Sequence, residues 1–155
     1  MSTKAESYLK RIAVQEKQFD ALYRSAGDRF GLPDCSMWVL YFLVSSKEPI
    51  TQQDLIGKMM FPKQTINSAV VKLAKDGFLE LRIIPGMRNR KTIQLTDAGK
   101  DLANNTVVRL LNAELRAVEA MGDNRMEQFI SLYTELSNAM REEFAGEGLF
   151  DKPND

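Results

Sequence analysis

Hydrophobic positions recur every three or four residues over most of the chain, the spacing that predicts amphipathic helices. From residue 5 to about residue 30 this spacing predicts a long first helix, which a Gly-Leu-Pro sequence ends. Residues 37–45 are apolar on almost every side, so we expect them to form a central, buried helix. Asp34 or Ser36 is the predicted cap of that second helix.

Two shorter helices are predicted next, over 51–60 and 62–76. Thr51-Gln-Gln-Asp has the pattern of a capping box and opens the first of them. Pro62 suits the first position of the second helix, and Gly77 suits the position just past its end. We expect this second helix to bury an apolar stripe formed by Ile66, Ala69, Val70, Leu73 and Ala74. Two short helices that follow a buried one and are separated by a tight break form a helix-turn-helix arrangement.

After Gly77 the hydrophobic period changes from 3.6 to 2, which predicts a β-hairpin. Leu79, Leu81 and Ile83 alternate with polar residues in the first strand, and residues 92–95 alternate again in the second. The tip between them, residues 85–91, is irregular and basic. A basic hairpin beside a helix-turn-helix is typical of a wing.

Two long helices are predicted at the end of the chain. Thr96 caps a helix over 97–121, and a second helix over 123–145 follows Gly122. Residues 146–155 show no period, so we expect a disordered tail. The predicted fold class is therefore mainly α with a small β-hairpin wing: a winged helix-turn-helix over about 34–96, within a single domain over 1–145.

Composition excludes several kinds of site. The 155 residues contain one cysteine, Cys35, and no histidine, which excludes an intrachain disulfide, a Cys-cluster metal site and histidine-based catalysis. A Gly-rich phosphate loop is also missing, so we expect no enzyme and no cofactor. Since the chain has neither a long apolar run nor a signal-peptide pattern, we expect a cytoplasmic protein that does not bind membranes.

The net charge of zero hides a strong local imbalance. The segment from Lys58 to Lys91 contains eight Lys or Arg residues but only Asp76 and Glu80 as acids, which gives +6, so the rest of the chain carries −6. Attraction to phosphate depends on such a local basic region and not on total charge.

The polar side of the helix over 62–76 has the chemistry of a DNA-binding face. It carries amides, hydroxyls and lysines without a carboxylate, and these groups pair with base edges and phosphates in the major groove. The alternative is an ordinary solvated helix face. We predict DNA contacts from this helix by Lys63, Gln64, Thr65, Asn67, Ser68 and Lys72, and from the start of the preceding helix by Thr51 and Gln52.

The predicted wing adds Arg88, Arg90 and Lys91 to the DNA-binding residues. Arginines of such a tip can enter the minor groove, where narrow A·T-rich DNA has an enhanced negative potential. The alternative is that these charges only keep an exposed loop soluble.

The order of elements and three short motifs resemble the MarR family of bacterial transcriptional regulators. The motifs are Thr51-Gln-Gln-Asp-Leu-Ile, the run from Lys63 to Glu80, and Ile93-Gln-Leu-Thr-Asp-Ala-Gly, and the resemblance covers about residues 5–145. It implies a homodimer in which the helices over 5–30, 97–121 and 123–145 form a shared dimerisation region. Two winged helices would then bind half-sites of a palindrome in double-stranded DNA roughly 34 Å apart. The wing departs from the Asp-Arg-Arg-like pattern of many members, because Met87, Arg88 and Asn89 stand there.

The resemblance also implies a site for a small aromatic or anionic effector, between the dimerisation helices and the winged domain. Trp38, Tyr41 and Phe42 are the predicted lining residues, with ordinary core packing as the alternative. Cys35 lies at a helix start, where a thiol can be reactive, although free cysteines are more often buried and inert.

Together these observations predict a homodimeric DNA-binding transcriptional regulator. We expect a repressor that binds a palindromic operator and that a small ligand or an oxidant releases. The alternative is a winged-helix protein-interaction module that does not bind DNA.

Overall fold

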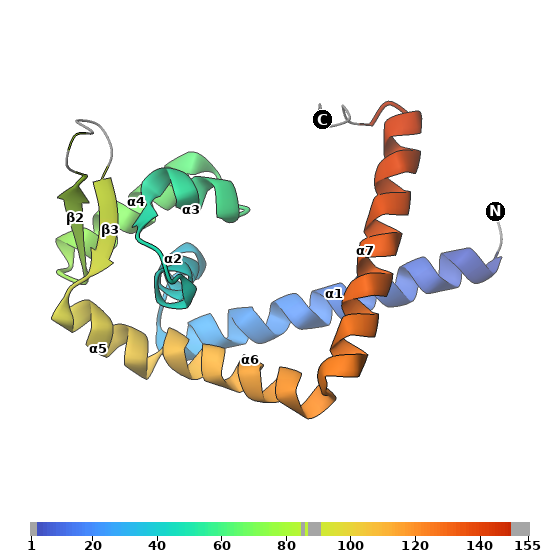
Figure 1. The fold of residues 1–155 in the computed structure, drawn as a ribbon, viewed down its shortest axis with the longest axis horizontal. Helices are drawn as coiled ribbons and strands as arrows, with labels where there is room; N and C mark the ends of the chain where they lie inside the picture. The colour runs from blue at the N-terminus through green and yellow to red at the C-terminus, as the bar shows by residue number, and fades with distance from the viewer. Residues whose placement is uncertain (1–2, 85, 87–90, 150–155) are drawn as a thin grey trace. The chain divides into compact units, whose positions relative to one another are not determined.

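A computed structural model describes residues 3–84, 86 and 91–149. The chain divides into two compact units, Met1–Leu111 and Asn112–Asp155. The first unit contains most of the secondary structure (Figure 1). Its elements are α1 (Thr3–Phe30), α2 (Asp34–Ser45), β1 (Ile50–Thr51), α3 (Gln52–Lys58), α4 (Lys63–Lys75), β2 (Leu79–Ile83), β3 (Lys91–Leu95), α5 (Asp97–Asn105) and the start of α6 (Val107–Met121).

Helix α2 lies in the core of the first unit, as its apolar sequence predicted. It contributes five buried residues, and α4 contributes the four buried residues Ile66, Ala69, Val70 and Leu73. Ala74 is partly buried against the same core. The predicted apolar stripe of α4 is therefore confirmed, and it fixes which side of the helix faces outward.

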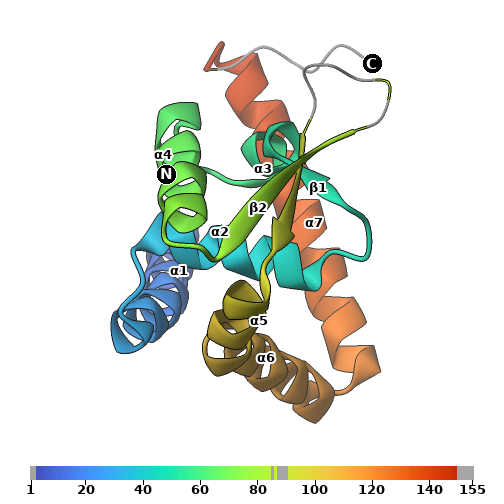
Figure 2. The same cartoon turned by 90° about the vertical axis from the view of Figure 1, so that its left-hand side faces the viewer.

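The sheet is antiparallel with the strand order β1-β3-β2, so the predicted hairpin is confirmed (Figure 2). Strand β1 was not predicted, because two residues are too few to show a period; it pairs Ile50 with Ile93. Of the apolar positions of β2, only Leu79 is buried, whereas Leu81 and Ile83 are 37% and 63% exposed. Strand β2 therefore leaves the helical core as it approaches the hairpin tip.

Several predicted helix starts differ from the structure by a few residues. Helix α2 begins at Asp34, directly after Pro33, and no side chain caps it. The prediction that Asp34 or Ser36 caps this helix is therefore wrong. Pro62 is the N-cap of α4 and not its first helical residue. In both cases a proline is the N-cap, and proline has no side-chain acceptor for the N–H groups of the first turn.

The predicted single helix over 97–121 is wrong, because the chain breaks it at Thr106. The backbone there has φ −127° and ψ −95°. The Thr106 hydroxyl donates to the Leu102 carbonyl at 2.6 Å, a local bond of the kind that competes with helical geometry. The apolar period continues through the break, so periodicity did not reveal it.

The second unit contains the rest of α6 and helix α7 (Asp123–Gly146). Gly122 separates the two helices with a positive φ of 80°, as its position predicted. No residue of α7 is buried. Residues 147–149 follow as a turn, and the rest of the predicted tail lies outside the described residues. Among the helices that the structure describes, none is long and apolar enough to span a bilayer.

Candidate nucleic-acid interface

The start of α3 has the capping box that its sequence predicted. The Thr51 hydroxyl accepts a hydrogen bond from the Asp54 backbone N–H at 3.2 Å, and the Asp54 carboxylate accepts one from the Thr51 backbone N–H at 2.8 Å. The Thr51 hydroxyl also donates to Asp54 Oδ2 at 2.7 Å. Thr51 therefore has a structural role, and its hydroxyl hydrogen is already donated to the Asp54 carboxylate.

The end of α4 is closed by backbone hydrogen bonds of the Schellman type. Gly77 has φ 83°, its N–H donates to the Ala74 carbonyl at 3.0 Å, and the Phe78 N–H donates to the Leu73 carbonyl at 2.9 Å. Only glycine adopts this backbone conformation without strain, which is why Gly77 stands here. The helix thus has a defined end directly before the sheet.

Most of the α4 residues that we predicted to contact DNA are exposed on its outer side. The exposed members are Lys63, Gln64, Thr65, Ser68 and Lys72. Lys75 is exposed on the same helix. The structure adds one residue that the sequence analysis missed, Val71, which is 61% exposed among these polar groups. Helical spacing alone identifies it, because it falls one turn after Asn67 and outside the apolar stripe.

Asn67 differs from its neighbours because it is half-buried and hydrogen bonded to another helix. Gln52 Nε2, at the start of α3, donates to Asn67 Oδ1 at 2.5 Å. Two predicted DNA-binding residues from separate helices are thus joined. This contact fixes the start of α3 against the outer side of α4.

Lys72 has a carboxylate partner. Lys72 Nζ lies 2.9 Å from Asp76 Oδ2, and the two side chains are 64% and 39% exposed. Asp76 is the C-cap of α4. The outer face of α4 is therefore free of carboxylates along the helix but has one at its C-terminal end. An exposed pair of this kind contributes little to stability, but it lowers the positive charge that Lys72 offers to a phosphate.

A hollow of about 510 Å³ lies between the start of α3, the start of α4 and β3. Its lining brings together five predicted DNA-binding residues and two neighbours: Thr51, Gln52, Gln53, Ile56, Lys63, Asn67 and Lys91. Lys91 therefore joins the residues of the two helices. Arg88 and Arg90 lie outside the described residues.

The predicted effector residues form an aromatic cluster between α1 and α2. Trp38 has its ring centroid 5.0 Å from that of Tyr23, 5.3 Å from that of Tyr41 and 6.2 Å from that of Phe42. The four side chains are half-buried. The rings thus pack against one another, as the core-packing alternative expects.

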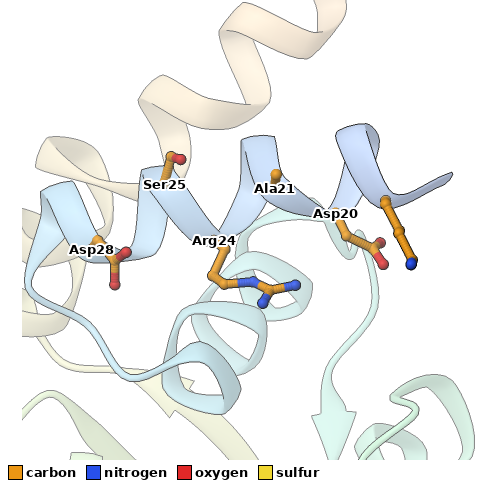
Figure 3. A pocket seen from close by; sticks show the side chains of 6 residues that line it. Asp20, Ala21, Arg24, Ser25 and Asp28 are labelled. Carbon is orange, nitrogen blue, oxygen red and sulfur yellow. The ribbon is translucent and has the colours of Figure 1, made fainter. Parts of the chain in front are cut away.

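A second hollow, of about 460 Å³, lies along α1 (Figure 3). Its lining consists of Lys17, Asp20, Ala21, Arg24, Ser25 and Asp28, all from this helix. Acidic and basic groups alternate along it and no aromatic side chain is present. It shares no residue with the predicted effector site.

Cys35 is buried, and burial raises the pKa of its thiol, with a further increase from the neighbouring Asp34 carboxylate. These effects oppose the lowering expected at a helix start and disfavour the reactive thiolate. The structure thus favours the inert alternative.

Solved structures with a similar fold are MarR family regulators. No family model matches the chain, and no curated protein matches its sequence. A MarR family regulator from Neisseria meningitidis is 22% identical with a TM-score of 0.71, over 94% of this chain and 99% of that chain. A MarR/EmrR family regulator from Acinetobacter is 15% identical with a TM-score of 0.64, over 92% and 99%.

A further similar structure is a mutant of MepR from S. aureus bound to an oligodeoxyribonucleotide. It is 18% identical with a TM-score of 0.52, over 87% of this chain and 97% of that chain. In each case the similarity covers at least 87% of this chain and at least 97% of the other chain. The chain therefore has the fold of the MarR family of transcriptional regulators, the family that its motifs resemble.

Proposed function

We propose that this protein is a DNA-binding transcriptional regulator, and that the outer side of α4 lies in the major groove. The observation that carries the proposal is the composition of that side: Lys63, Gln64, Ser68 and Lys75 are exposed together. Amides, hydroxyls and lysines bind base edges and phosphates, whereas a protein-binding helix normally presents large apolar side chains. The DNA-bound MepR structure supports the same role for this fold.

The proposal includes a homodimer that binds a palindromic operator. Support comes from apolar side chains that the single chain leaves exposed on α1, α6 and α7. Those exposed to at least 45% are Tyr8, Leu9, Val14, Phe19, Leu22, Leu115, Val118, Phe129, Ile130, Leu132, Tyr133 and Phe144. Apolar surface of this extent marks an interface between proteins.

We further propose a cytoplasmic repressor that a small aromatic or anionic effector releases from DNA. Release by an oxidant acting on Cys35 is the weaker form of the proposal, because the buried thiol has a raised pKa. The effector form predicts that a bound compound lowers operator affinity without covalent change.

The direct test is retention of duplex DNA that flanks the protein's own gene, measured by gel shift at several salt concentrations. Affinity should fall steeply as the salt concentration rises. In a plot of log affinity against log salt concentration, each neutralised phosphate should make the slope more negative by about 0.9. A protected palindrome with half-sites about one helical turn apart would support the dimeric arrangement.

Charge variants of α4 sharpen this test. Lys75→Gln should weaken binding to all duplexes alike and reduce the salt slope by about one for each subunit that loses a phosphate contact. Lys47→Gln, the same charge change at an exposed position between α2 and β1, is the matched control and should leave binding unchanged. If the wild-type protein retains no duplex even in dilute buffer, the DNA-binding proposal is wrong and the protein-interaction alternative gains support.

A further inference from the structure

We propose that Asn67 and Val71 of α4 together recognise a thymine in the major groove, and that Gln52 is the positioning residue that orients Asn67 for this contact. The inference deepens the proposed function and rests on it. It names thymine as the base that the Asn67 and Val71 part of the outer face of α4 contacts.

The first step is the direction of the Asn67 amide. An asparagine side chain has an acceptor oxygen on one side and two N–H donors on the other. Gln52 Nε2 donates to Asn67 Oδ1 at 2.5 Å in a part-buried contact, so the oxygen faces α3. The Asn67 Nδ2 group is therefore directed away from Gln52 and presents N–H donors. Because Asn67 and Gln52 both line the hollow beside Lys63, this donor borders an open and basic surface.

The second step is the position of Val71. It follows Asn67 by four residues, so the two side chains are neighbours on one side of the helix. Val71 is 61% exposed, although Asn67, Ser68 and Lys75 around it on the helix surface are polar. A single exposed valine is ordinary on a protein surface. Here, however, it places a methyl-bearing group next to an oriented hydrogen-bond donor.

Thymine is the base whose major-groove edge matches this pair. It presents the O4 acceptor beside the C5 methyl group. Cytosine and adenine present an amino donor to the groove, and guanine has acceptors but no methyl group. The common pairing of asparagine with adenine uses the oxygen and the nitrogen of the amide together. Gln52 opposes that pairing because its Nε2 already donates to one lone pair of the oxygen and holds the oxygen toward α3.

The test for Val71 uses a duplex that the full-length wild-type protein selects from a randomised pool. Each thymine of that duplex is replaced in turn by deoxyuridine, which removes only the methyl group. We expect one thymine in each half-site at which this replacement weakens wild-type binding about fourfold, the effect of one buried methyl group. With Val71→Ala, the same replacement should have no effect. If no thymine is sensitive, or if Val71→Ala is equally sensitive, the inference is overturned.

The test for Gln52 uses a variant that reverses its hydrogen bond. In Gln52→Glu the side chain only accepts, so Asn67 must turn and present its oxygen outward. The preferred base at the sensitive position should then change from thymine to adenine or cytosine, which offer a donor. Gln52→Met should lose the preference without acquiring a new one. Preference is measured as a ratio of affinities, because the added carboxylate weakens binding to every duplex.

Three further outcomes separate failure of the Gln52 role, failure of the thymine assignment and failure of the proposed function. If Gln52→Glu, shown to be folded by circular dichroism, keeps the thymine preference, Gln52 does not orient Asn67. If replacing adenine by 7-deazaadenine weakens binding while deoxyuridine does not, Asn67 recognises adenine and the inference is wrong. If wild-type protein retains no duplex, the proposed function itself fails, which is distinct from retention without thymine sensitivity.

Discussion

Gly99, in the first turn of α5, has less space for an added Cβ atom than the other described glycines. A Cβ atom there would lie 1.9 Å from the Phe78 carbonyl oxygen and 2.9 Å from its carbonyl carbon. Since both are backbone atoms, neither can rotate away. Gly99→Ala should therefore lower the free energy of unfolding by about 2–3 kcal/mol, measured by urea denaturation.

Gly57 provides the control for this prediction. It lies in α3 with nothing within 4 Å of an added Cβ. Gly57→Ala should leave the protein as stable or raise its stability by roughly 0.5–1 kcal/mol, because alanine is the better helix former. If the two substitutions had equal effects, the close approach at Gly99 would not be the cause.

Cys35 gives a second prediction at the scale of the residue. Burial raises the pKa of its thiol, so at pH 8 the folded protein holds less thiolate than the unfolded chain. Alkylation by iodoacetamide should therefore be at least roughly tenfold slower in the folded protein than in urea. The preference of the fold for the neutral thiol also adds stability at low pH, which is lost as the pH rises through the folded pKa. Rapid alkylation of the folded protein would instead revive the oxidant form of the proposal.

Single residues were predictable where their partners are close in sequence. The roles of Thr51, Gly77 and Thr96 follow from local rules for helix ends, and the structure confirms them. The contact between Gln52 and Asn67 could not be predicted, because fifteen positions separate the two residues and only the packing of α3 on α4 brings them together. Val71 was missed because the predicted contact residues were chosen by their polar chemistry, although its spacing already placed it outside the apolar stripe.

At the scale of the element, α3 shows how much a short helix depends on its cap. It has seven residues and one buried side chain, Leu55, so little packing holds it. Replacing Thr51 by alanine should cost about 1 kcal/mol in thermal or urea unfolding. Thr51→Ser, which keeps the hydroxyl, should recover most of the loss. An equal loss in both variants would show that the methyl group and not the cap stabilises the helix.

The elements themselves were predictable wherever the hydrophobic period and a Pro or Gly coincided. Gly122 separates α6 from α7 as expected, and the period change after Gly77 marks the hairpin correctly. The break at Thr106 carries neither signal, since it falls at a threonine within an unbroken apolar period. Strand β1 depends on pairing with β3, far along the chain, and so leaves no local pattern.

At the scale of the whole molecule, the exposed apolar side chains of α7 are the main feature that one chain leaves unexplained. The family resemblance implies that the long helices form a shared dimerisation region, and the structure shows no buried residue on α7. Leu132 is 66% exposed there. If a second copy covers it, Leu132→Glu should shift sedimentation at micromolar concentration from dimer to monomer, because a buried unpaired carboxylate is costly.

Ile83→Glu is the matched control for the oligomeric state. Ile83 is 63% exposed but belongs to β2, outside the predicted dimerisation helices. The Ile83→Glu variant should therefore sediment as the wild-type protein does. A monomeric wild-type protein would contradict the dimer, and with it the palindromic operator.

Thr96 joins three parts of the first unit. Its hydroxyl donates to the Gly77 carbonyl at 2.6 Å and accepts from the Gly99 N–H at 3.0 Å, while its own N–H donates to the Phe78 carbonyl at 3.1 Å. A tilt of α5 must therefore break these bonds or carry the tail of α4 with it. Because Gly77 and Phe78 directly follow α4, a tilt of α5 that keeps these bonds would also displace the end of α4 that holds Lys75.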